Sequence, residues 1–373
     1  MRIAAIGDAH LGRSAFSVVN QERGVNQREL DFELAFAAAI EAALATEPDL
    51  IVWLGDIFDH PRPSFRSYRV AQRGLATIRA HGRRAVIISG NHDTPRLPGM
   101  GSPYSALADA FPEMHWAHRL TYEAFDIGGV RVHCVPQMLK VEHTLEALDE
   151  ADRNRALDLT NLLLTHPRLI QVEPRHADIN EIEVDQGALK ADLVLLGHYH
   201  NPQEVIQGIW YVGSPDSFNF ADEPERPKGV ATLDTATGAF AHVEIPPQRP
   251  MVTLETVHAA GLSTAELQSR MVASISAAPA QGIARLFLEL VDPDAYRLVD
   301  GDTVREAGAH ALHVKLEPKF ISVSNQVHLP ELDTMPARWE NYVAGQDLDG
   351  YDRERVRQLG IDYLSNAVEG AQP

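Results

Sequence analysis

The sequence contains a single cysteine, Cys134, so it cannot form an internal disulfide bond. No uninterrupted apolar run approaches the roughly 18 residues that a membrane-spanning helix needs. At the N-terminus, Arg2 leads directly into the apolar run 3–6, without the charged leader, long apolar stretch and cleavage site of a secretory signal. These absences exclude small disulfide-rich scaffolds, and we expect a soluble, cytoplasmic protein without a membrane partner.

The sequence also lacks a phosphate-binding loop of the pattern Gly-x-x-x-x-Gly-Lys-Ser/Thr. We therefore expect no ATP hydrolysis by this chain alone, and any ATP dependence would come from a partner. The composition excludes intrinsic disorder, because 45% of the 373 residues are hydrophobic and can bury a substantial core. The length favours two domains.

Positive charge is scarce overall, and the formal net charge is −19. Because Lys and Arg hold phosphate backbones, this balance argues against a polyanionic partner. Its distribution weakens the objection: residues 1–96 hold 12 basic and 11 acidic residues (net +1), and residues 97–373 hold 21 and 41 (net −20). Eight arginines and one acid, Asp93, lie between Pro61 and Arg96. Nucleic acid therefore stays a candidate partner.

Short apolar runs alternate with helical patterns in the first part of the chain. The runs 3–6, 50–54, 85–88, 162–164 and 193–196 are typical of strands buried on both faces, and segments 29–44 and 68–79 suit crossover helices. Later runs at 130–135, 209–212, 230–233 and 240–245 follow one another with fewer helices. This pattern predicts an α/β protein built on a mixed sheet or a sandwich.

Pro246, Pro247 and Pro250 cluster where the strand pattern stops, so we place a domain boundary near residue 250. Strand-like runs at 252–257, 285–291 and 313–317 and a helical stretch at 264–275 predict a small α+β domain over residues 251–330. Residues 338–343 and 353–368 suit helices separated by a loop. We therefore predict a helix–loop–helix segment over residues 331–373.

Polar clusters follow five of the predicted strands. They contain Asp8 and His10, Asp56 and Asp59, Asn91, His92 and Asp93, His166, and His198 and His200. Ligands bind at the carboxyl ends of strands in an open α/β sheet, so residues far apart in the sequence can converge there. Residues i and i+2 of an extended segment project to the same side, which lets each of the pairs 8/10 and 198/200 reach a common centre. Glycines that precede Asp56, Asn91 and His198 would permit close backbone approach.

Oxygen and imidazole ligands without thiolate suit Mn²⁺, Fe or Zn²⁺ rather than an iron–sulfur cluster. A lone histidine after a strand is more often a core or surface group, but seven candidate ligands at strand ends argue for a metal site. Seven also exceed the usual coordination of one ion, so we expect two ions bridged by Asp56. The candidate ligands are Asp8, His10, Asp56, Asn91, His166, His198 and His200.

The ordered clusters resemble the motifs of the calcineurin-like metallophosphoesterases, and within that superfamily the chain is similar to the SbcD-type DNA double-strand-break repair nuclease subunits. The further matching segments are Asp8-Ala9-His10-Leu11-Gly12, Arg28-Glu29-Leu30-Asp31-Phe32 with Ala35-Phe36, Gly213-Ser214-Pro215, Phe220, Glu223 and Lys228-Gly229. The resemblance implies a mixed β-sandwich flanked by helices, the metallophosphoesterase fold. Residues 1–250 would form the nuclease domain and 251–330 a capping, DNA-binding domain.

The resemblance also implies roles for the site residues. One metal would be held by Asp8, His10, Asp56 and His200, and the other by Asp56, Asn91, His166 and His198. Both ions are expected to be Mn²⁺. His92 would face the scissile phosphate and Asp93 would orient it. Asp59 stands where archaeal and eukaryotic relatives usually carry a second catalytic histidine, and His60 is a candidate substitute.

The implied function is a Mn²⁺-dependent DNA exonuclease and endonuclease for repair and recombination, which cleaves double-stranded ends, hairpins and single strands with a two-metal-activated hydroxide. The implied partners are an SbcC-type coiled-coil ATPase, docked by residues 331–373, and a second copy in a homodimer. Apolar positions that would contact the ATPase are Val356, Leu359, Ile361 and Leu364. A helix packed on its own domain would show the same pattern.

Two other functions fit part of the pattern. A small-substrate metallophosphodiesterase, for cyclic nucleotides or other diesters, would use the same site. A metal-stabilised scaffold without catalysis is the other, but the intact ligand set and His92 argue against it. Protein phosphatases of the superfamily typically carry Arg after the Asp at position 59, whereas this chain has His60.

Four arginines, Arg62, Arg66, Arg69 and Arg73, repeat at spacings of 4, 3 and 4 residues and would share one helix face. They are candidates for gripping a DNA backbone. A solvated helix face or a dimer surface is an equally good interpretation. Arg13 follows the first motif and is a further candidate DNA contact.

Overall fold

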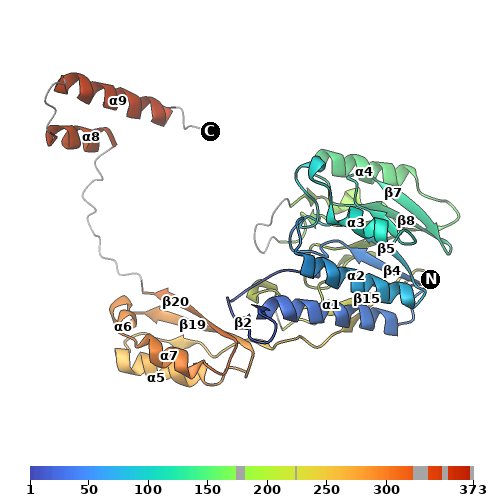
Figure 1. Ribbon diagram of the computed structural model, residues 1–373, viewed down its shortest axis with the longest axis horizontal. Coiled ribbons are helices and arrows are strands. Elements are labelled where there is room, and N and C mark those ends of the chain that lie inside the picture. The colour runs from blue at the N-terminus through green and yellow to red at the C-terminus, as the bar shows by residue number, and fades with distance from the viewer. Residues whose placement is uncertain (174–180, 223–224, 322–334, 347–351, 370–373) are drawn as a thin grey trace. The chain divides into compact units, whose positions relative to one another are not determined.

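The computed structural model describes residues 1–173, 181–222, 225–321, 335–346 and 352–369 (Figure 1). The chain divides into two compact units, residues 1–320 and residues 321–373. Among the described residues, no helix has the length and apolar character needed to cross a bilayer.

Two six-stranded sheets form the centre of the first unit, in the orders β16-β15-β1-β4-β5-β6 and β13-β14-β12-β9-β8-β7. The first contains β1 (Arg2–Ile6), β4 (Leu50–Leu54), β5 (Arg84–Ile88), β6 (His115–Ala117), β15 (Gly229–Asp234) and β16 (Ala239–Glu244). The second contains β7 (Glu123–Ile127), β8 (Val130–Val135), β9 (Thr160–Thr165), β12 (Leu193–Leu196), β13 (Gln203–Ile206) and β14 (Ile209–Tyr211). Both sheets are mixed, with parallel inner strands; antiparallel pairs lie at the β16 edge of the first sheet, whose β6 edge is parallel, and at both edges of the second.

The sheets pack face to face, and helices cover their outer faces. Ile3 and Ala5 of β1 lie in the core between the sheets, whereas Ala4 and Ile6 lie in the core beneath the helices. Helices α1 (Gln27–Ala45), α2 (Phe65–Ala80) and α3 (Pro103–Ala110) cover the first sheet, and α4 (Val141–Arg153) covers the second (Figure 1). Burial on both faces explains the continuous apolar runs. The predicted mixed β-sandwich flanked by helices is confirmed.

Residues 251–320 form a smaller sheet within the first unit. The strands of this sheet are β17 (Met251–Thr253), β18 (Val257–His258), β19 (Ile283–Val291) and β20 (His313–Phe320). The same region contains helices α5 (Thr264–Ile275), α6 (Pro293–Arg297) and α7 (Gly301–Ala307). Residues 254–256 separate β17 from β18, so the run 252–257 is two strands rather than one. A separate core packs Leu267 and Met271 of α5 against Leu286 of β19. The predicted domain end at residue 330 lies outside the described residues.

The second unit contains helices α8 (Met335–Ala344) and α9 (Arg353–Glu369). They pack on each other, since the indole of Trp339 donates to the carbonyl of Arg357 at 3.1 Å and Arg353 donates to the carbonyl of Val343 at 3.0 Å. Both predicted C-terminal helices are therefore present. The predicted start of this segment, at residue 331, and part of its loop lie outside the described residues.

Short elements complete the described structure. They are β2 (Val19–Asn20), β3 (Val25–Asn26), β10 (Arg168–Leu169), β11 (Glu183–Val184), η1 (Pro98–Met100), η2 (Gln186–Ala188) and η3 (Phe220–Asp222).

Candidate metal centre

The carboxyl ends of β1, β4, β5, β9 and β12 carry the predicted ligands, and the structure brings them together. Asp8, His10, Asp56, Asn91 and His166 are buried, and His198 and His200 are partly exposed. Three groups have ligand atoms within 4.8 Å of one another: Asp8 with His10 and His200, Asp8 with Asp56 and His166, and His10 with Asp59 and His92. The convergence that the spacing predicts is therefore observed, although the ligands come from two sheets rather than one.

Asp56 and His166 lie at the middle of the cluster. The Nε2 atom of His166 is 3.2 Å from Oδ2 of Asp56, 3.7 Å from Oδ1 of Asp8 and 3.1 Å from Oδ1 of Asn91. Asp56 also lies 3.6 Å from Nε2 of His10. This places the Asp56 carboxylate between the His10 and His166 imidazoles, as a bridging ligand would be.

Each candidate histidine ligand is held from one side by an oxygen atom, which leaves its other ring nitrogen directed at the cluster. The four pairs are His10 with Asp59 (3.2 Å), His166 with the carbonyl of Leu54 (2.5 Å), His198 with Glu181 (2.8 Å) and His200 with Asp222 (3.1 Å). Oxygen acceptors of this kind fix the ring orientation and tautomer of metal-binding histidines. Sequence reasoning missed Glu181 and Asp222, because neither belongs to a strand-end cluster.

The chemistry of the cluster fits divalent cations. The Nε2 atom of His10 is buried and has no hydrogen-bond partner among the described residues, and such an orphaned atom is costly unless a ligand satisfies it. Burial disfavours an imidazolium, yet the Asp56 and Asp8 carboxylates raise the pKa of His166 to about 9. Burial also opposes ionisation of Asp56, but His166 and His92 hold the pKa of that carboxyl below its usual range. The site therefore favours positive charge, and Asp, Asn and His ligands suit Mn²⁺, Fe or Zn²⁺.

Backbone conformation at the cluster is strained in the way that functional sites often are. Asp8, His10, Asp56 and His198 all have positive φ, at 21°, 46°, 51° and 84°, a region that non-glycine residues rarely adopt. Such strain persists only where the surrounding structure enforces it. Four of the seven candidate ligands share this property, which sequence patterns do not reveal.

Three glycines make room for His166. A Cβ atom on Gly55, whose φ is +93°, would lie 2.6 Å from Nδ1 of His166, and one on Gly197 would lie 2.5 Å from the same atom. A Cβ atom on Gly90 would overlap Asp56 and lie 2.7 Å from Cε1 of His166. The predicted need for close backbone approach is therefore met at Asp56, Asn91 and His198.

His92 lies at the edge of the cluster. Its backbone N–H donates to Oδ1 of Asp56 at 2.9 Å, and its Nδ1–H donates to the backbone carbonyl of Asp59 at 2.9 Å. The His92 ring meets the His10 ring edge-on at 4.5 Å. Because a carbonyl can only accept, Nδ1 carries the proton of the neutral ring, and Nε2 is then its basic nitrogen.

Asp59 connects two groups at the rim. Its carboxylate accepts from His10 and, at 2.9 Å, from Arg13, whose guanidinium also lies over the ring of Phe218. Burial opposes ionisation, but His10 and Arg13 lower the pKa of Asp59. The candidate substitute His60 is exposed, and its Nδ1 accepts from the N–H of Arg62. Asp59, rather than His60, thus lies with His10 and His92.

Asp93 is buried beneath the loop that follows β4. It accepts from the N–H of Phe58 at 2.9 Å and from the hydroxyl of Tyr104 at 2.6 Å. Burial and the Asp56 charge raise the pKa of Asp93 to about 7. Its hydrogen bonds therefore run to the loop after Asp56 and to α3, rather than to the imidazole of His92 that the sequence assigned to it.

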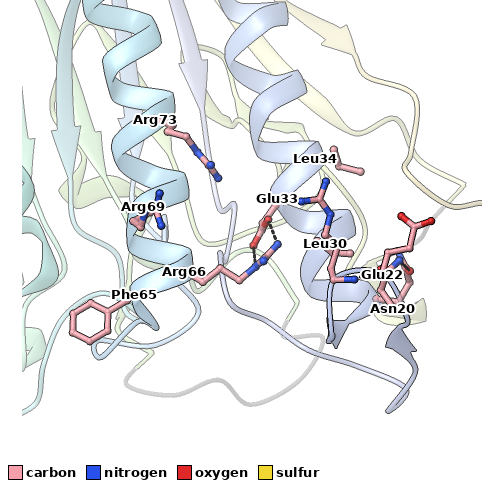
Figure 2. Close-up of a pocket in the computed structure, with 11 residues that line it drawn as sticks. Asn20, Glu22, Leu30, Glu33, Leu34, Phe65, Arg66, Arg69 and Arg73 are labelled. Atoms are coloured by element: carbon pink, nitrogen blue, oxygen red, sulfur yellow. Dashed lines mark hydrogen bonds and ion pairs between the residues drawn. The ribbon is translucent and has the colours of Figure 1, made fainter.

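The four spaced arginines do not share one environment. Arg66 pairs bidentately with Glu33 of α1 at 2.6 and 2.7 Å, whereas Arg69 and Arg73 are exposed on α2 (Figure 2). Arg62 is also exposed and donates to the sulfur of Met100 at 3.5 Å. A groove between α1 and α2 is lined by Arg66, Arg69 and Arg73 together with exposed Phe65. The charge of Arg66 is therefore offset within the chain.

Comparison with known proteins decides the family. The family model described as calcineurin-like phosphoesterase matches residues 1–202, more than half of the chain. The chain belongs to this family. The match ends two residues after His200 and so includes every candidate ligand. The predicted family and its fold are thereby confirmed.

The chain also resembles curated proteins, at a sequence identity of about one quarter. The DNA double-strand break repair protein Mre11 of Methanococcus maripaludis is 24% identical over 61% of this chain and 60% of its own length. Its namesake from Saccharolobus solfataricus is 26% identical over 58% of this chain and 55% of its own. The chain thus spans less than two thirds of either relative. The crystal structure of the Thermus thermophilus protein TT1561 covers 65% of this chain and 98% of its own, with 16% identity and a TM-score of 0.40.

Proposed function

We propose that this phosphoesterase is a Mn²⁺-dependent DNA nuclease of the SbcD type, which cleaves phosphodiesters at DNA ends as part of double-strand-break repair. The observation that carries the proposal is the cluster of Asp8, His10, Asp56, His166 and His200 at the seam of the sandwich, with His92 at its rim. The names of the curated relatives described above, both DNA double-strand break repair proteins, support the choice of DNA as substrate.

Two groups of residues would hold the two ions. Asp8, His10, Asp56 and His200 would hold the first, and Asp56, Asn91, His166 and His198 the second. Two divalent ions supply an activated water and offset negative charge on the phosphate. The chain's own contribution is to fix the ligands: Asp59, Glu181, Asp222 and the Leu54 carbonyl hold the four imidazoles in place before substrate binds.

His92 is the proposed acid for the leaving 3′ oxygen. The Asp59 carbonyl accepts from its Nδ1–H, so a protonated His92 presents Nε2–H at the rim of the cluster. The carboxylate Oδ1 of Asp59 lies 3.8 Å from Nδ1 of the same ring. Asp93 contributes indirectly, because its hydrogen bonds to residues 57 and 58 hold the loop that carries Asp56 and Asp59.

DNA would be gripped by arginines, of which Arg13 is half-buried and Arg62, Arg69 and Arg73 are exposed. Arg13 lies beside Asp59 at the rim, and Arg62, Arg69 and Arg73 extend from the region of α2. Arg66 contributes less, because Glu33 offsets its charge. Each phosphate contact that is lost should lower the slope of log binding constant against log salt concentration by about one. Arg69→Gln should therefore change this slope more than Arg66→Gln does, because Glu33 already offsets the charge of Arg66.

Partner binding is proposed for two further surfaces. Leu359 and Tyr363 of α9 are 62% and 77% exposed, and Tyr342 of α8 is 58% exposed; these residues would dock on the coiled coil of an SbcC-type ATPase. The alternative use of the groove between α1 and α2, in place of the DNA contacts of Arg69 and Arg73, is a homodimer surface centred on Phe65, which is 91% exposed. Sedimentation of wild type and Phe65→Glu tests the dimer, and co-purification of Leu359→Asp with the ATPase tests the docking.

The first experiment incubates the purified chain with linear duplex DNA and with a bis-aryl phosphodiester, in Mn²⁺, Mg²⁺ or chelator. Asp56→Ala and His92→Ala are the matched variants. Asp56→Ala should lose activity because both ion sites need its carboxylate, and His92→Ala should lose turnover while keeping the metals. The duplex should be shortened from its ends in Mn²⁺.

Cleavage of the diester alone, even with a candidate ATPase added, would replace the nuclease with a small-substrate phosphodiesterase. Undiminished duplex cleavage by Asp56→Ala would remove the two-metal site from the reaction.

A further inference from the structure

Two sequence motifs that the proposed chemistry does not use meet in the structure. Arg28, Asp31 and Phe32 belong to the first turns of α1, and residues 214–218 belong to the loop after β14. The guanidinium of Arg28 is 1% exposed, donates to Asp31 at 3.0 Å and to the carbonyl of Ser217 at 2.7 Å, and lies 3.7 Å from Asp216. One buried cation therefore ties the start of α1 to this loop.

The loop carries an aromatic ring to the metal centre. Phe218 is 2% exposed, and its ring meets those of His10 at 4.8 Å and His200 at 4.4 Å, both edge-on. The Phe32 ring of α1 also packs on Phe218, with ring centroids 4.8 Å apart, and the Arg28 guanidinium lies over Phe32 at 4.5 Å. The imidazoles in contact with Phe218 are those of the first proposed ion. None of the ring contacts of Phe218 in the described structure involves His166 or His198.

The Phe218 backbone is fixed from two sides. Its N–H donates to Oδ2 of Asp222 at 2.7 Å, while Oδ1 of the same carboxylate accepts from His200. The preceding carbonyl, that of Ser217, is the acceptor of Arg28. A shift of the Ser217–Phe218 peptide would therefore move the Phe218 ring and the Asp222 carboxylate together, and that carboxylate orients His200.

We infer that Arg28 is a positioning residue for the first metal-ion site, acting through the Ser217 carbonyl and the Phe218 ring without touching a ligand. Burying a guanidinium costs several kcal/mol, and apolar replacements of buried ion pairs are often as stable, so stability alone is a weak reason for this charge. Holding the loop in one place is a sufficient reason. The inference rests on the proposed two-ion site.

The test measures Mn²⁺ binding by titration calorimetry and counts bound ions after dialysis. Arg28→Lys keeps the charge but loses the planar fork that reaches Asp31 and Ser217 at once. Phe218→Leu removes the ring contacts and retains an apolar side chain. Each substitution should weaken the binding of one of the two Mn²⁺ ions about tenfold and leave the affinity for the other unchanged. A tenfold change is typical of residues that support metal ligands. Arg83→Lys, whose parent donates to the Pro48 carbonyl far from the ligands in the fold, is the matched control.

The double variant separates a positioning role from a structural one. If Arg28 acts through Phe218, the Arg28→Lys/Phe218→Leu protein should bind the first ion no more weakly than the weaker single variant, because the two effects share one route. Thermal unfolding of the metal-free proteins reports stability independently.

Two results would overturn the inference: a lowered unfolding temperature of Arg28→Lys with both Mn²⁺ affinities within twofold of wild type, or multiplicative effects in the double variant. If Arg28→Lys does not fold, an unchanged affinity in Phe218→Leu overturns it equally. Fewer than two bound Mn²⁺ in the wild type would instead refute the two-ion proposal itself.

Discussion

The carboxylates behind His200 and His198 offer a comparison within one site. Asp222 is buried and accepts from His200, from the N–H of Phe218 and from the N–H of Asn219. In Asp222→Asn the amide oxygen can keep a backbone donor, but the negative charge facing His200 is lost. A buried hydrogen bond to a charged group contributes about 1.5–3 kcal/mol, and support of this kind typically changes metal affinity about 10- to 100-fold. We therefore expect Asp222→Asn to lower the Mn²⁺ affinity of the first ion site about 10- to 100-fold and to leave the second site unchanged.

Glu181 should matter less to the second ion. Its side chain is 15% exposed and it shares its charge with Arg168 at 3.0 Å. Water can replace part of the hydrogen bond to His198, so we expect Glu181→Gln to weaken the second ion only about two- to fivefold. Mn²⁺ titrations against a competing chelator resolve both affinities. Equal losses in the two variants, or a change below twofold in Asp222→Asn, would refute the reasoning from burial.

Three further predictions concern stability. Tyr104→Phe removes the donor to buried Asp93 and should lower the unfolding free energy by about 1–3 kcal/mol in urea at pH 8; a loss under about 0.5 kcal/mol would contradict it. Burial lowers the pKa of His118 to about 4, so the unfolded chain takes up a proton below about pH 6.5 that the folded chain refuses. Stability relative to His118→Phe should therefore fall by on the order of 2 kcal/mol as the pH drops from 7 to 4, and parallel curves would exclude this cause. Chelator should lower the unfolding temperature, and Mn²⁺ at about 100 times the dissociation constant of a site should restore about 2.7 kcal/mol for the ion bound there; an unchanged temperature would argue against ion binding.

Much of the sandwich could be predicted because its strands are buried on both faces. The runs at 50–54 and 193–196 coincide with β4 and β12, and 264–275 with α5. Helix α4 was missed because Val141 and Leu145 are exposed and polar residues dominate its sequence. The edge strand β7 was missed because only alternate residues are exposed and its short sequence, EAFDI, contains two acidic residues and no continuous apolar run.

The candidate site divides in the same way. The ligands follow strands directly, so their convergence could be predicted from strand order. Glu181 and Phe218 lie in loops and Asp222 ends η3, outside the strand-end clusters, and only the folded chain shows that they contact His198 and His200. The contacts of Asp93 with Phe58 and Tyr104 could not be predicted, because adjacency in sequence says nothing about the side to which a buried carboxylate points, and its role toward His92 stays a prediction.

The ligands belong to opposite halves of the sandwich, with Asp8, Asp56 and Asn91 on loops of the first sheet and His166, His198 and His200 on loops of the second. With the proposed ions bound, any opening that separates the two sheets at this end would have to release them first. Ion binding then adds its free energy to that opening, and amide hydrogen exchange in β4 and β9 should slow by one common factor when Mn²⁺ is added. The two sheets should consequently exchange as a single cooperative unit with metal and as two units without it.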